Sequence, residues 1–253
     1  MGFTVIIPAR LKSSRLPRKP LADIGGQPMV VRAAQTALRS EATRVVVAVD
    51  DEAVFEAVKA AGLEVVMTRV DHPTGTDRLS EVVEVLGLDD DEIVVNLQGD
   101  EPLMPPHVLN DVATCLAQRS DCAMATAAHP IDSIESFLNP NVVKVTLDER
   151  QTALTFSRAP IPWPRDHFRG TKGSLPEGFV AYHHLGLYAY RARFLRRYPS
   201  LAQAPMEKWE SLEQLRALYY GERIAVMVLE EALPAGVDTP EDLERVRALY
   251  AKG

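Results

Sequence analysis

Residues 3–21 read FTVIIPARLKSSRLPRKPL and contain the most informative pattern in the sequence. Its apolar run, residues 3–7, ends at Pro8, which is typical of a strand buried on both faces of a parallel sheet. A basic segment punctuated by prolines follows at residues 10–20. From Pro28 onward, apolar residues recur at helical spacing, and proline suits a first helical turn because its missing N–H is not needed there. The predicted order is therefore strand, basic loop, helix.

The same alternation continues along the chain. We expect further strands at residues 44–49, 64–68 and 93–97, and helices at 51–61, 75–86 and 106–119. Beyond residue 123, extended pieces broken by prolines predict a mixed continuation of the sheet, at 124–131, 142–147, 152–158 and 183–190. A helix over 207–220, a strand over 224–229 and a helix over 240–251 close the chain. Such alternation predicts an α/β fold with right-handed crossovers and a mostly parallel sheet.

The composition is that of an ordinary globular protein. The 253 residues are 46% apolar and 25% charged, which predicts one domain with a sizeable core. We expect a cytoplasmic protein without a membrane contact, because there is no apolar run of about 20 residues and no signal-peptide pattern. The two cysteines, Cys115 and Cys122, lack the spacing of a zinc site. The net charge of −7 argues against nucleic acid as a partner.

The charge is unevenly distributed. Residues 1–40 contain seven basic residues and one acid, whereas the remainder carries −13. Five cations and two serines, Ser13 and Ser14, lie between Arg10 and Lys19, just beyond the first strand, where open α/β sheets bind ligands. Most Lys/Arg runs are solvated turns. Here the cations stand between prolines and an apolar strand in an acidic protein, which favours a polyphosphate site.

Absent motifs narrow the phosphate chemistry. Neither GxxxxGK[ST] nor GxGxxG occurs in the chain, which argues against a P-loop kinase and an NAD dehydrogenase. We therefore expect Arg and Lys side chains, rather than mainly backbone amides, to neutralise the phosphates.

Two carboxylates are candidate magnesium ligands. Asp100, in QGDEP (98–102), follows a strand and emerges at the same sheet edge as the basic loop. Magnesium bound with nucleotide phosphates usually takes one or two carboxylates and keeps several waters. Asp238, in GVDTPED (236–242), is open to two interpretations, because Asp or Thr before Pro and Glu is also a helix N-cap pattern.

Other motifs are equally open on spacing alone. The segment TGTDR (74–78) begins a helix whose amides and Arg78 are placed to contact a base or phosphate, or it is only a helix cap. Arg158 is suited to bind a carboxylate, although most arginines lie at the surface. The acidic run at 89–92 contains a DxD pattern but is more typical of a solvated turn.

Two adjacent histidines are expected on a strand. His183 and His184 would then face opposite sides, so one metal could not easily bind both. An inward histidine together with Tyr188 is suited to contact sugar hydroxyls.

The basic loop matches the pattern A-R-x-x-S-x-R-L-P-x-K-x-L and in this resembles the sugar nucleotidyltransferases. Over essentially the whole chain, the sequence resembles the 3-deoxy-manno-octulosonate (KDO) cytidylyltransferase, or CMP-KDO synthetase, family. The segments that carry this resemblance are IIPAR, PTGTDRL, VNLQGDEP, FSRAPIPW, HHLGLYAYR, LEQLR and GVDTPEDLERVR.

The resemblance implies transfer of CMP from CTP to the anomeric hydroxyl of KDO, with release of pyrophosphate, for lipopolysaccharide synthesis in a Gram-negative cell. It further implies a Rossmann-like nucleotidyltransferase fold, Mg²⁺ as cofactor and a cytoplasmic homodimer. Within a single domain over 1–253, residues 1–130 would mainly bind nucleotide. Residues 131–223 would form a sugar-binding and dimerisation lobe, and 224–253 would return to the core.

The matching motifs also imply roles for individual residues. The CTP ligands would be Ala9, Arg10, Arg15, Lys19, Thr74, Gly75, Arg78 and Asp100, and Arg10, Lys19 and Asp100 would be catalytic. The KDO ligands would be Gln98, Arg158, His184, Tyr188, Glu213 and Gln214, with Arg158 suited to the sugar carboxylate. Asp100 and Asp238 would be the magnesium ligands. Arg18 and His183 depart from what relatives often carry at these positions.

Three competing functions follow from the same sequence. A cytidylyltransferase for another sugar acid, such as a sialic acid, would share the basic loop. A glycosyltransferase would use Asp89-Asp90-Asp91 and turn over a CMP-sugar rather than CTP. A nucleotide sensor would bind CTP without releasing pyrophosphate.

Overall fold

A mixed β-sheet forms the centre of the computed structural model, which describes residues 2–12, 15–170 and 173–251. The strand order is β11-β7-β10-β6-β1-β4-β5, and β8 and β9 extend the sheet from β10. The strands are β1 (Phe3–Ala9), β4 (Arg44–Val49), β5 (Glu64–Met67), β6 (Ile93–Asn96), β7 (Met124–Pro130), β8 (Lys144–Leu147), β9 (Ala153–Ser157), β10 (Tyr182–Arg191) and β11 (Ile224–Val228). A separate hairpin pairs β2 (Asp23–Ile24) with β3 (Gln27–Pro28).

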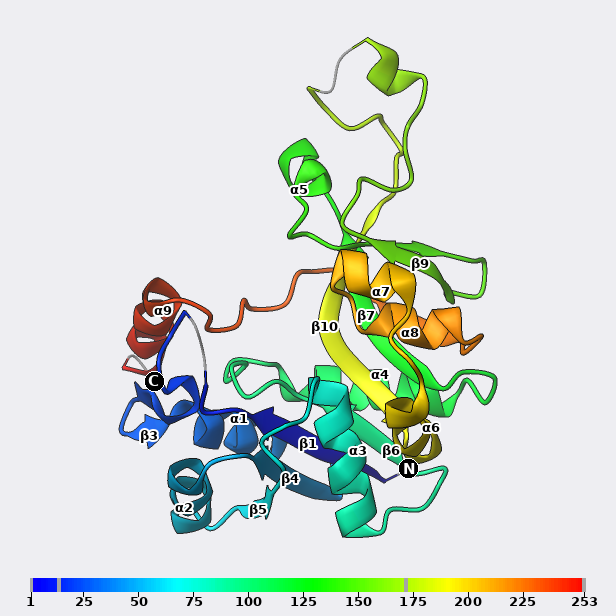
Figure 1. Ribbon diagram of the computed structural model, residues 1–253. Coiled ribbons are helices and arrows are strands. Elements are labelled where there is room, and N and C mark those ends of the chain that lie inside the picture. The colour runs from blue at the N-terminus through cyan, green and yellow to red at the C-terminus, as the bar shows by residue number, and fades with distance from the viewer. Residues whose placement is uncertain (1, 13–14, 171–172, 252–253) are drawn as a thin grey trace.

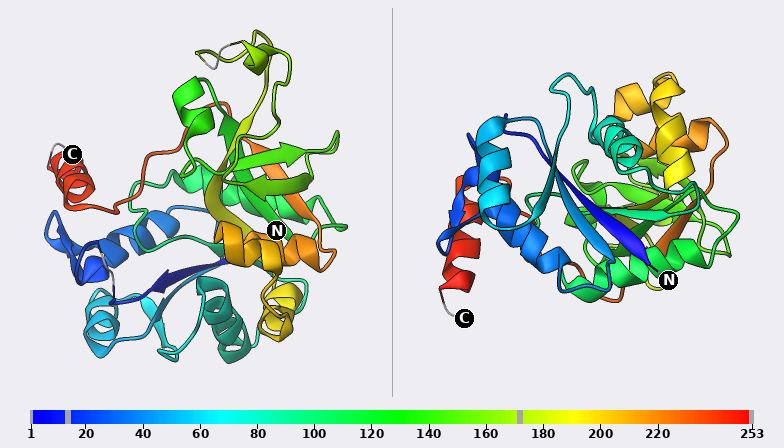
Figure 2. Two further views of the ribbon diagram at one scale, coloured as in Figure 1. Left: turned by 45° about the horizontal axis from the view of Figure 1, so that its top comes forward. Right: turned by 90° about the horizontal axis from the view of Figure 1, so that it is seen from below.

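Helices cover both faces of this sheet (Figures 1 and 2). Apolar residues of α1, α2 and α4 join one core cluster, and those of α3, α6 and α8 join the cluster on the opposite face. The helices are α1 (Met29–Ala37), α2 (Glu52–Ala60), α3 (Gly75–Leu86), α4 (Pro106–Ala117), α5 (Ile134–Leu138), α6 (Ala192–Arg197), α7 (Pro205–Glu210), α8 (Gln214–Tyr219) and α9 (Pro240–Tyr250), with 3₁₀ turns η1 (Lys19–Leu21), η2 (His167–Arg169) and η3 (Tyr198–Ser200). The expected α/β architecture is confirmed.

β1 lies in the interior of the sheet, as its apolar sequence predicts. It pairs in parallel with β4, Val5 opposite Val45, and with β6, Val5 opposite Val95. Ile7 belongs to the core cluster on one face and Ile6 to the cluster on the other. The carboxyl ends of β1, β4 and β6 therefore lie at one edge of the sheet, where the basic loop begins.

β10 changes the direction of the sheet next to β6. It runs antiparallel to both β6 and β7, and its register with β7 shifts between Leu185 and Tyr188. A bulge of this kind re-aims side chains and is frequent beside functional sites. Ligand sites of α/β proteins lie at such points of changing strand order, so the edge beside β6 and β10 is where a site is expected.

The single helix expected over residues 207–220 is wrong. The chain forms α7 and α8 instead, separated at Ser211, whose backbone is left-handed with φ of 52°. Arg216 donates two hydrogen bonds to buried Glu207, at 2.8 and 2.6 Å, and this ion pair holds α8 against α7. The break leaves Glu213 at the N-cap of α8, outside any continuous helix.

A small lobe stands away from the sheet (Figure 1). It consists of α5 and the described residues between 159 and 181, and Phe137 and Phe168 are buried in a core cluster of its own. The lobe is smaller than the range 131–223, since β8, β9 and β10 within that range belong to the central sheet. Within the described ranges, the helices are all too short or too polar to cross a membrane.

Candidate active site

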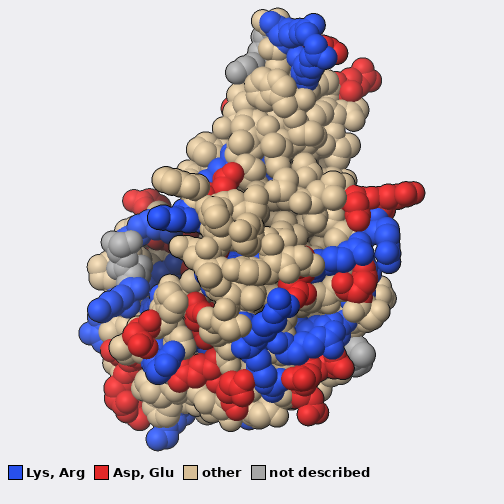
Figure 3. Space-filling view, turned by 45° about the vertical axis from the view of Figure 1, so that its right-hand side comes forward, with Lys and Arg blue, Asp and Glu red and all other residues tan. Residues whose placement is uncertain are grey.

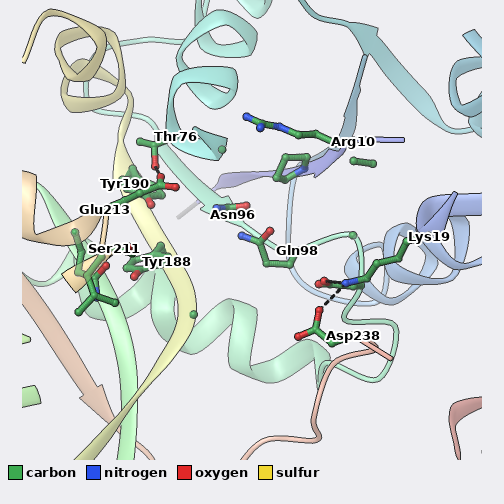
Figure 4. Close-up of a pocket in the computed structure, with 18 of the residues that line it drawn as sticks. Arg10, Lys19, Thr76, Asn96, Gln98, Tyr188, Tyr190, Ser211, Glu213 and Asp238 are labelled. Carbon is green, nitrogen blue, oxygen red and sulfur yellow. Dashed lines mark hydrogen bonds and ion pairs between the residues drawn. The ribbon is translucent and has the colours of Figure 1, made fainter. Parts of the chain in front are cut away.

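A cavity of about 660 Å³ opens at the carboxyl ends of β1 and β6, beside β10 (Figure 4). Most residues expected to bind CTP, the sugar or a metal converge on its wall. These residues are Ala9, Arg10, Arg15, Lys19, Gly75, Gln98, Asp100, His184, Tyr188, Glu213, Gln214 and Asp238. They come from segments spread over the whole sequence, and the fold brings them to one place. Ser13 and Ser14 of the basic loop lie outside the described residues.

Lys19 joins the two candidate metal ligands. At the start of η1 its ammonium forms an ion pair with Asp100 and lies 2.9 Å from Asp238 Oδ1, and Arg15 reaches the same oxygen at 3.1 Å. Burial on its own lowers the pKa of Lys19, but the two carboxylates outweigh it and the pKa is raised. The cation therefore stays charged in the physiological range and holds both carboxylates together.

The N-cap of α9 is Thr239 rather than Asp238. The hydroxyl of Thr239 accepts a hydrogen bond from the N–H of Asp242. The side chain of Asp242 in turn accepts from the backbone N–H groups of Asp238 and Thr239. The carboxylate of Asp238 is consequently not used as the cap and faces Lys19. The backbone at Gly236 passes close to the backbone of Asp100, where a Cβ on residue 236 would lie 3.3 Å from the carbonyl oxygen of Asp100.

The donor set at this end of the cavity fits magnesium. Two carboxylates beside a phosphate-binding loop are what Mg²⁺ usually takes from a protein, with water and phosphate oxygens as its other ligands. Among the described residues, no cluster of three or more His, Cys, Asp or Glu side chains forms a fuller cage. Burial, with help from neighbouring Asp100, raises the pKa of Glu101 to about 8. Glu101 is therefore mostly neutral at pH 7 and adds little further charge.

Arg10 and the start of α3 form the wall of the cavity that the sequence motifs assign to the nucleotide, here called the nucleotide wall. Arg10 lines the cavity and donates to the carbonyl oxygen of His72 at 3.0 Å. Thr74 caps α3 by accepting a hydrogen bond from Asp77 N–H, so its hydroxyl has a structural partner. Gly75 lies on the cavity wall, where an absent side chain leaves the helix N-terminus open to a ligand.

Arg78 lies elsewhere than the motif suggested. It is fully buried beneath the nucleotide wall, and its guanidinium donates to Asp50 at 2.9 Å and Thr68 at 2.6 Å. Asp50 also accepts the backbone N–H of Leu11 at 3.1 Å. The structure thus connects Arg78 to the basic loop through Asp50, and Arg78 is not on the described wall of the cavity.

The opposite wall carries polar residues without net positive charge. Gln98, Tyr188 and Gln214 line it, and Glu213 accepts a hydrogen bond from Thr76 Oγ1 at 2.8 Å. This bond connects the turn before α8 with the first turn of α3, and the two side chains lie next to each other at one side of the cavity (Figure 4). Hydroxyl-rich ligands suit such a wall, because amide groups both accept and donate hydrogen bonds there and the carboxylate accepts them.

The two histidines face opposite sides of β10, as expected. His184 lines the cavity, with its Nε2 3.0 Å from Thr126 Oγ1, and burial lowers its pKa to about 3. His183 points the other way and lies 3.0 Å from Nε2 of His129, and burial lowers its pKa to about 4. Both rings are therefore neutral at pH 7, and His183 adds no charge to the cavity.

Arg158 is held beside the cavity rather than on its described wall. Its guanidinium donates to the carbonyl oxygens of Glu210 at 2.6 Å and Pro140 at 3.0 Å. Both acceptors are neutral carbonyl oxygens, so these two hydrogen bonds do not pair the guanidinium with a carboxylate.

Several residues of the cavity wall were not anticipated from the sequence, namely Thr76 as a sugar-wall contact, Asn96, Tyr190, Tyr198 and Ser211. For Tyr190 a signal exists, since it lies two positions along β10 from the expected residue Tyr188. Residues two apart share a face of a strand. For Ser211 we find no signal, because its place follows from the break between α7 and α8.

The acidic run at residues 89–92 is a surface turn. It precedes β6, at the sheet edge opposite the cavity, and Asp90 and Asp91 form ion pairs with Arg196 and Arg193 of α6. This confirms the interpretation as a solvated turn.

Comparison with known proteins agrees with this geometry. The sequence profile of the family described as cytidylyltransferase matches residues 4–224. A solved CMP:2-keto-3-deoxy-manno-octonic acid synthetase, complexed with CTP, is 43% identical, with a TM-score of 0.87 over 100% of this chain and 99% of that one, which confirms the resemblance to CMP-KDO synthetases.

Two more distant structures share the fold. A cytidylyltransferase from Leptospira borgpetersenii serovar Hardjo-bovis (strain JB197) is 16% identical, with a TM-score of 0.64 over 100% of this chain and 88% of that one. HddC from Yersinia pseudotuberculosis is 12% identical, with a TM-score of 0.65 over 98% and 99%. Given a family match over most of its length and a relative of 43% identity over all of it, the chain belongs to the cytidylyltransferase family.

Proposed function

We propose that this protein activates KDO for lipopolysaccharide synthesis by transferring CMP from CTP to its anomeric hydroxyl, with release of pyrophosphate. The observation that carries the proposal is the division of one cavity. Cations and paired carboxylates gather at one end, beside the basic loop, and neutral polar and tyrosine side chains form the other. The relative of 43% identity was solved with CTP and is named for this sugar.

The reaction we infer is an in-line displacement at the α-phosphorus. A bond forms between the anomeric oxygen and that phosphorus, the bond to the β-phosphate oxygen breaks, and the hydroxyl proton leaves to solvent. Arg10, Arg15 and Lys19 bind the triphosphate and neutralise the charge that develops on the departing pyrophosphate. Positioning and charge stabilisation then supply most of the rate enhancement.

Asp100 and Asp238 would hold magnesium in this proposal. A bound magnesium ion would supply neutralisation of phosphate charge and a lower pKa for the attacking hydroxyl. Lys19 keeps both carboxylates within reach of one point, which supports a shared role for them.

The sugar contacts we propose are Gln98, His184, Tyr188, Glu213 and Gln214 on the cavity wall. As neutral imidazole, His184 can donate or accept a hydrogen bond without adding charge beside the sugar acid.

Arg158 is the proposed partner of the sugar carboxylate. To bind it, the guanidinium has to exchange the carbonyl oxygens of Glu210 and Pro140 for carboxylate oxygens. That exchange replaces neutral acceptors by a charged, bidentate one, which is the stronger interaction.

We further infer a cytoplasmic homodimer in which the small lobe contributes to the contact. The lobe exposes large apolar side chains, with Trp163 47% and Val180 53% exposed. Figure 3 shows few charged side chains over the part of this face below the tip of the lobe. Light scattering on the purified protein should give twice 27.9 kDa, and a mass of one subunit at micromolar concentration would contradict the inference.

Pyrophosphate release tests the function directly. With CTP and magnesium, the purified protein should release pyrophosphate when KDO is added, and it should stay silent without an acceptor, with chelated magnesium, or with another nucleoside triphosphate. Turnover of a sialic acid in place of KDO would support cytidylyltransferase activity but overturn the assignment of KDO as the sugar. Binding of CTP with no turnover of either acceptor would favour a nucleotide sensor.

The glycosyltransferase alternative has no support in the geometry. Its candidate motif, residues 89–91, lies at the sheet edge opposite the cavity, and two of its three carboxylates are paired with arginines.

A further inference from the structure

Asn96 is the last residue of β6 and lies on the floor of the cavity. Its side chain is 4% exposed and belongs to the cavity wall. Figure 4 shows it between Gln98 on one side and Tyr190 and Glu213 on the other. Val94, on the same face of β6, is packed in a core cluster. Asn96 instead lines the cavity.

One half of the Asn96 carboxamide is engaged by the protein. Asn96 is a hydrogen-bond partner of Tyr190, which lines the same cavity. Of the two polar atoms of the carboxamide, Oδ1 is the one that is buried without a partner.

The other half has no partner. Asn96 Oδ1 is buried and accepts no hydrogen bond from any described residue. Gln214 Nε2 is likewise buried and donates to no described residue. Gln214 is 5% exposed and lines the same cavity. Buried polar atoms in native proteins nearly always have a partner, and exceptions mark places where a water or a ligand completes the bonding. One unpaired acceptor and one unpaired donor on a single cavity fit hydroxyl groups, because a hydroxyl both donates and accepts.

The chemistry of the cavity decides which part of the reactants meets Asn96. Phosphate oxygens cannot donate to a carboxamide oxygen, and the cations that would hold them lie at the Lys19 end. Asn96 is grouped instead with Gln98, Tyr190 and Glu213, on the side assigned above to the sugar.

We propose that the carboxamide oxygen of Asn96 accepts a hydrogen bond from a hydroxyl group of the acceptor sugar and so selects for a polyol bearing a hydroxyl at that position. This inference rests on the proposed function and adds a specificity-determining residue to it.

Substitution combined with substrate analogues tests this role. Asn96→Leu keeps the approximate shape of the side chain and removes the acceptor. We expect kcat/KM for KDO to fall roughly 10–100-fold, because a substrate donor loses its buried partner, while the KM for CTP changes less than about 2-fold. We then compare KDO analogues that each lack one hydroxyl. With the unsubstituted enzyme, kcat/KM for one of these analogues should be lower than for KDO by a similar factor. With Asn96→Leu, that analogue and KDO should have the same kcat/KM.

Controls separate this outcome from trivial ones. Asn110→Leu makes the same change on α4, where Asn110 accepts the N–H of Glu41 away from the cavity, and it should leave kcat/KM unchanged. Asn96→Ser, which is shorter, serves if the leucine variant fails to fold. The proposal would be overturned if the effects of Asn96→Leu and of removing a hydroxyl were additive for every analogue. An increase in the KM for CTP as the main effect of Asn96→Leu would also overturn it. If the unsubstituted enzyme releases no pyrophosphate with CTP and KDO, it is the proposed function that fails.

Discussion

The Asp100→Ala and Lys19→Ala variants are each expected to lose at least about 100- to 1,000-fold in kcat while remaining folded. Asp100 and Lys19 form one ion pair in the cavity, and Lys19 also holds Asp238 at 2.9 Å. Removal of Lys19 takes away the cation that we propose stabilises the leaving pyrophosphate, and removal of Asp100 takes away half of the proposed metal site. Steady-state pyrophosphate release with saturating CTP, KDO and magnesium measures the effect.

Matched substitutions outside the cavity give the baseline. Lys59→Ala on α2 and Asp111→Ala on α4 change exposed side chains of the same types and should keep normal turnover. Asp100→Asn keeps the shape and removes the charge, so it should be as inactive as Asp100→Ala. Near-normal turnover of Lys19→Ala or Asp100→Ala would disprove the roles assigned to them.

The Asp50→Ala variant should lose about 3–5 kcal/mol of unfolding free energy. Its partner, Arg78, is fully buried, and without Asp50 the guanidinium keeps only Thr68 among the partners described above. A buried charge stripped of its counter-charge is strongly destabilising, whereas removal of both charges is much less so. Urea unfolding followed by circular dichroism gives the difference directly.

The double variant Asp50→Ala/Arg78→Met provides the decisive comparison. It should recover a substantial part of the stability lost by Asp50→Ala, because no unpaired charge stays buried. A loss equal to the sum of the two single variants would show that the pair is not coupled. Because Asp50 also accepts the N–H of Leu11, at 3.1 Å, we expect both variants to bind CTP more weakly even where they are folded.

Much of the fold was predictable because its signals are local. The strand at residues 44–49 and the helix at 75–86 were placed at their observed bounds. The strand is apolar on both faces, and the helix has a threonine cap at Thr74 and a left-handed glycine at Gly87. The break at Ser211 escaped prediction since it depends on the contact of Glu207 with Arg216, and such contacts are not encoded in periodicity.

The residues of the candidate site likewise fall into those with a local sequence signal and those that depend on distant contacts. Residues that extend a strand or open a helix, such as Lys19, Asp100 and Gly75, reach the cavity because the sheet edge collects them. Arg78 does not reach it, since its guanidinium is paired with the carboxylate of Asp50, 28 positions earlier in the chain. A pattern within one helix cannot reveal whether a long side chain points to a ligand or to a distant carboxylate.

The order of synthesis gives the pairing of Lys19 with Asp238 a temporal meaning. These residues are 219 positions apart, and at about 5–20 residues per second a ribosome needs roughly 10–45 s to make the intervening chain. The basic loop and Asp100 are thus both made before Asp238. The two carboxylates of the proposed metal site are present together only after this late segment has been translated.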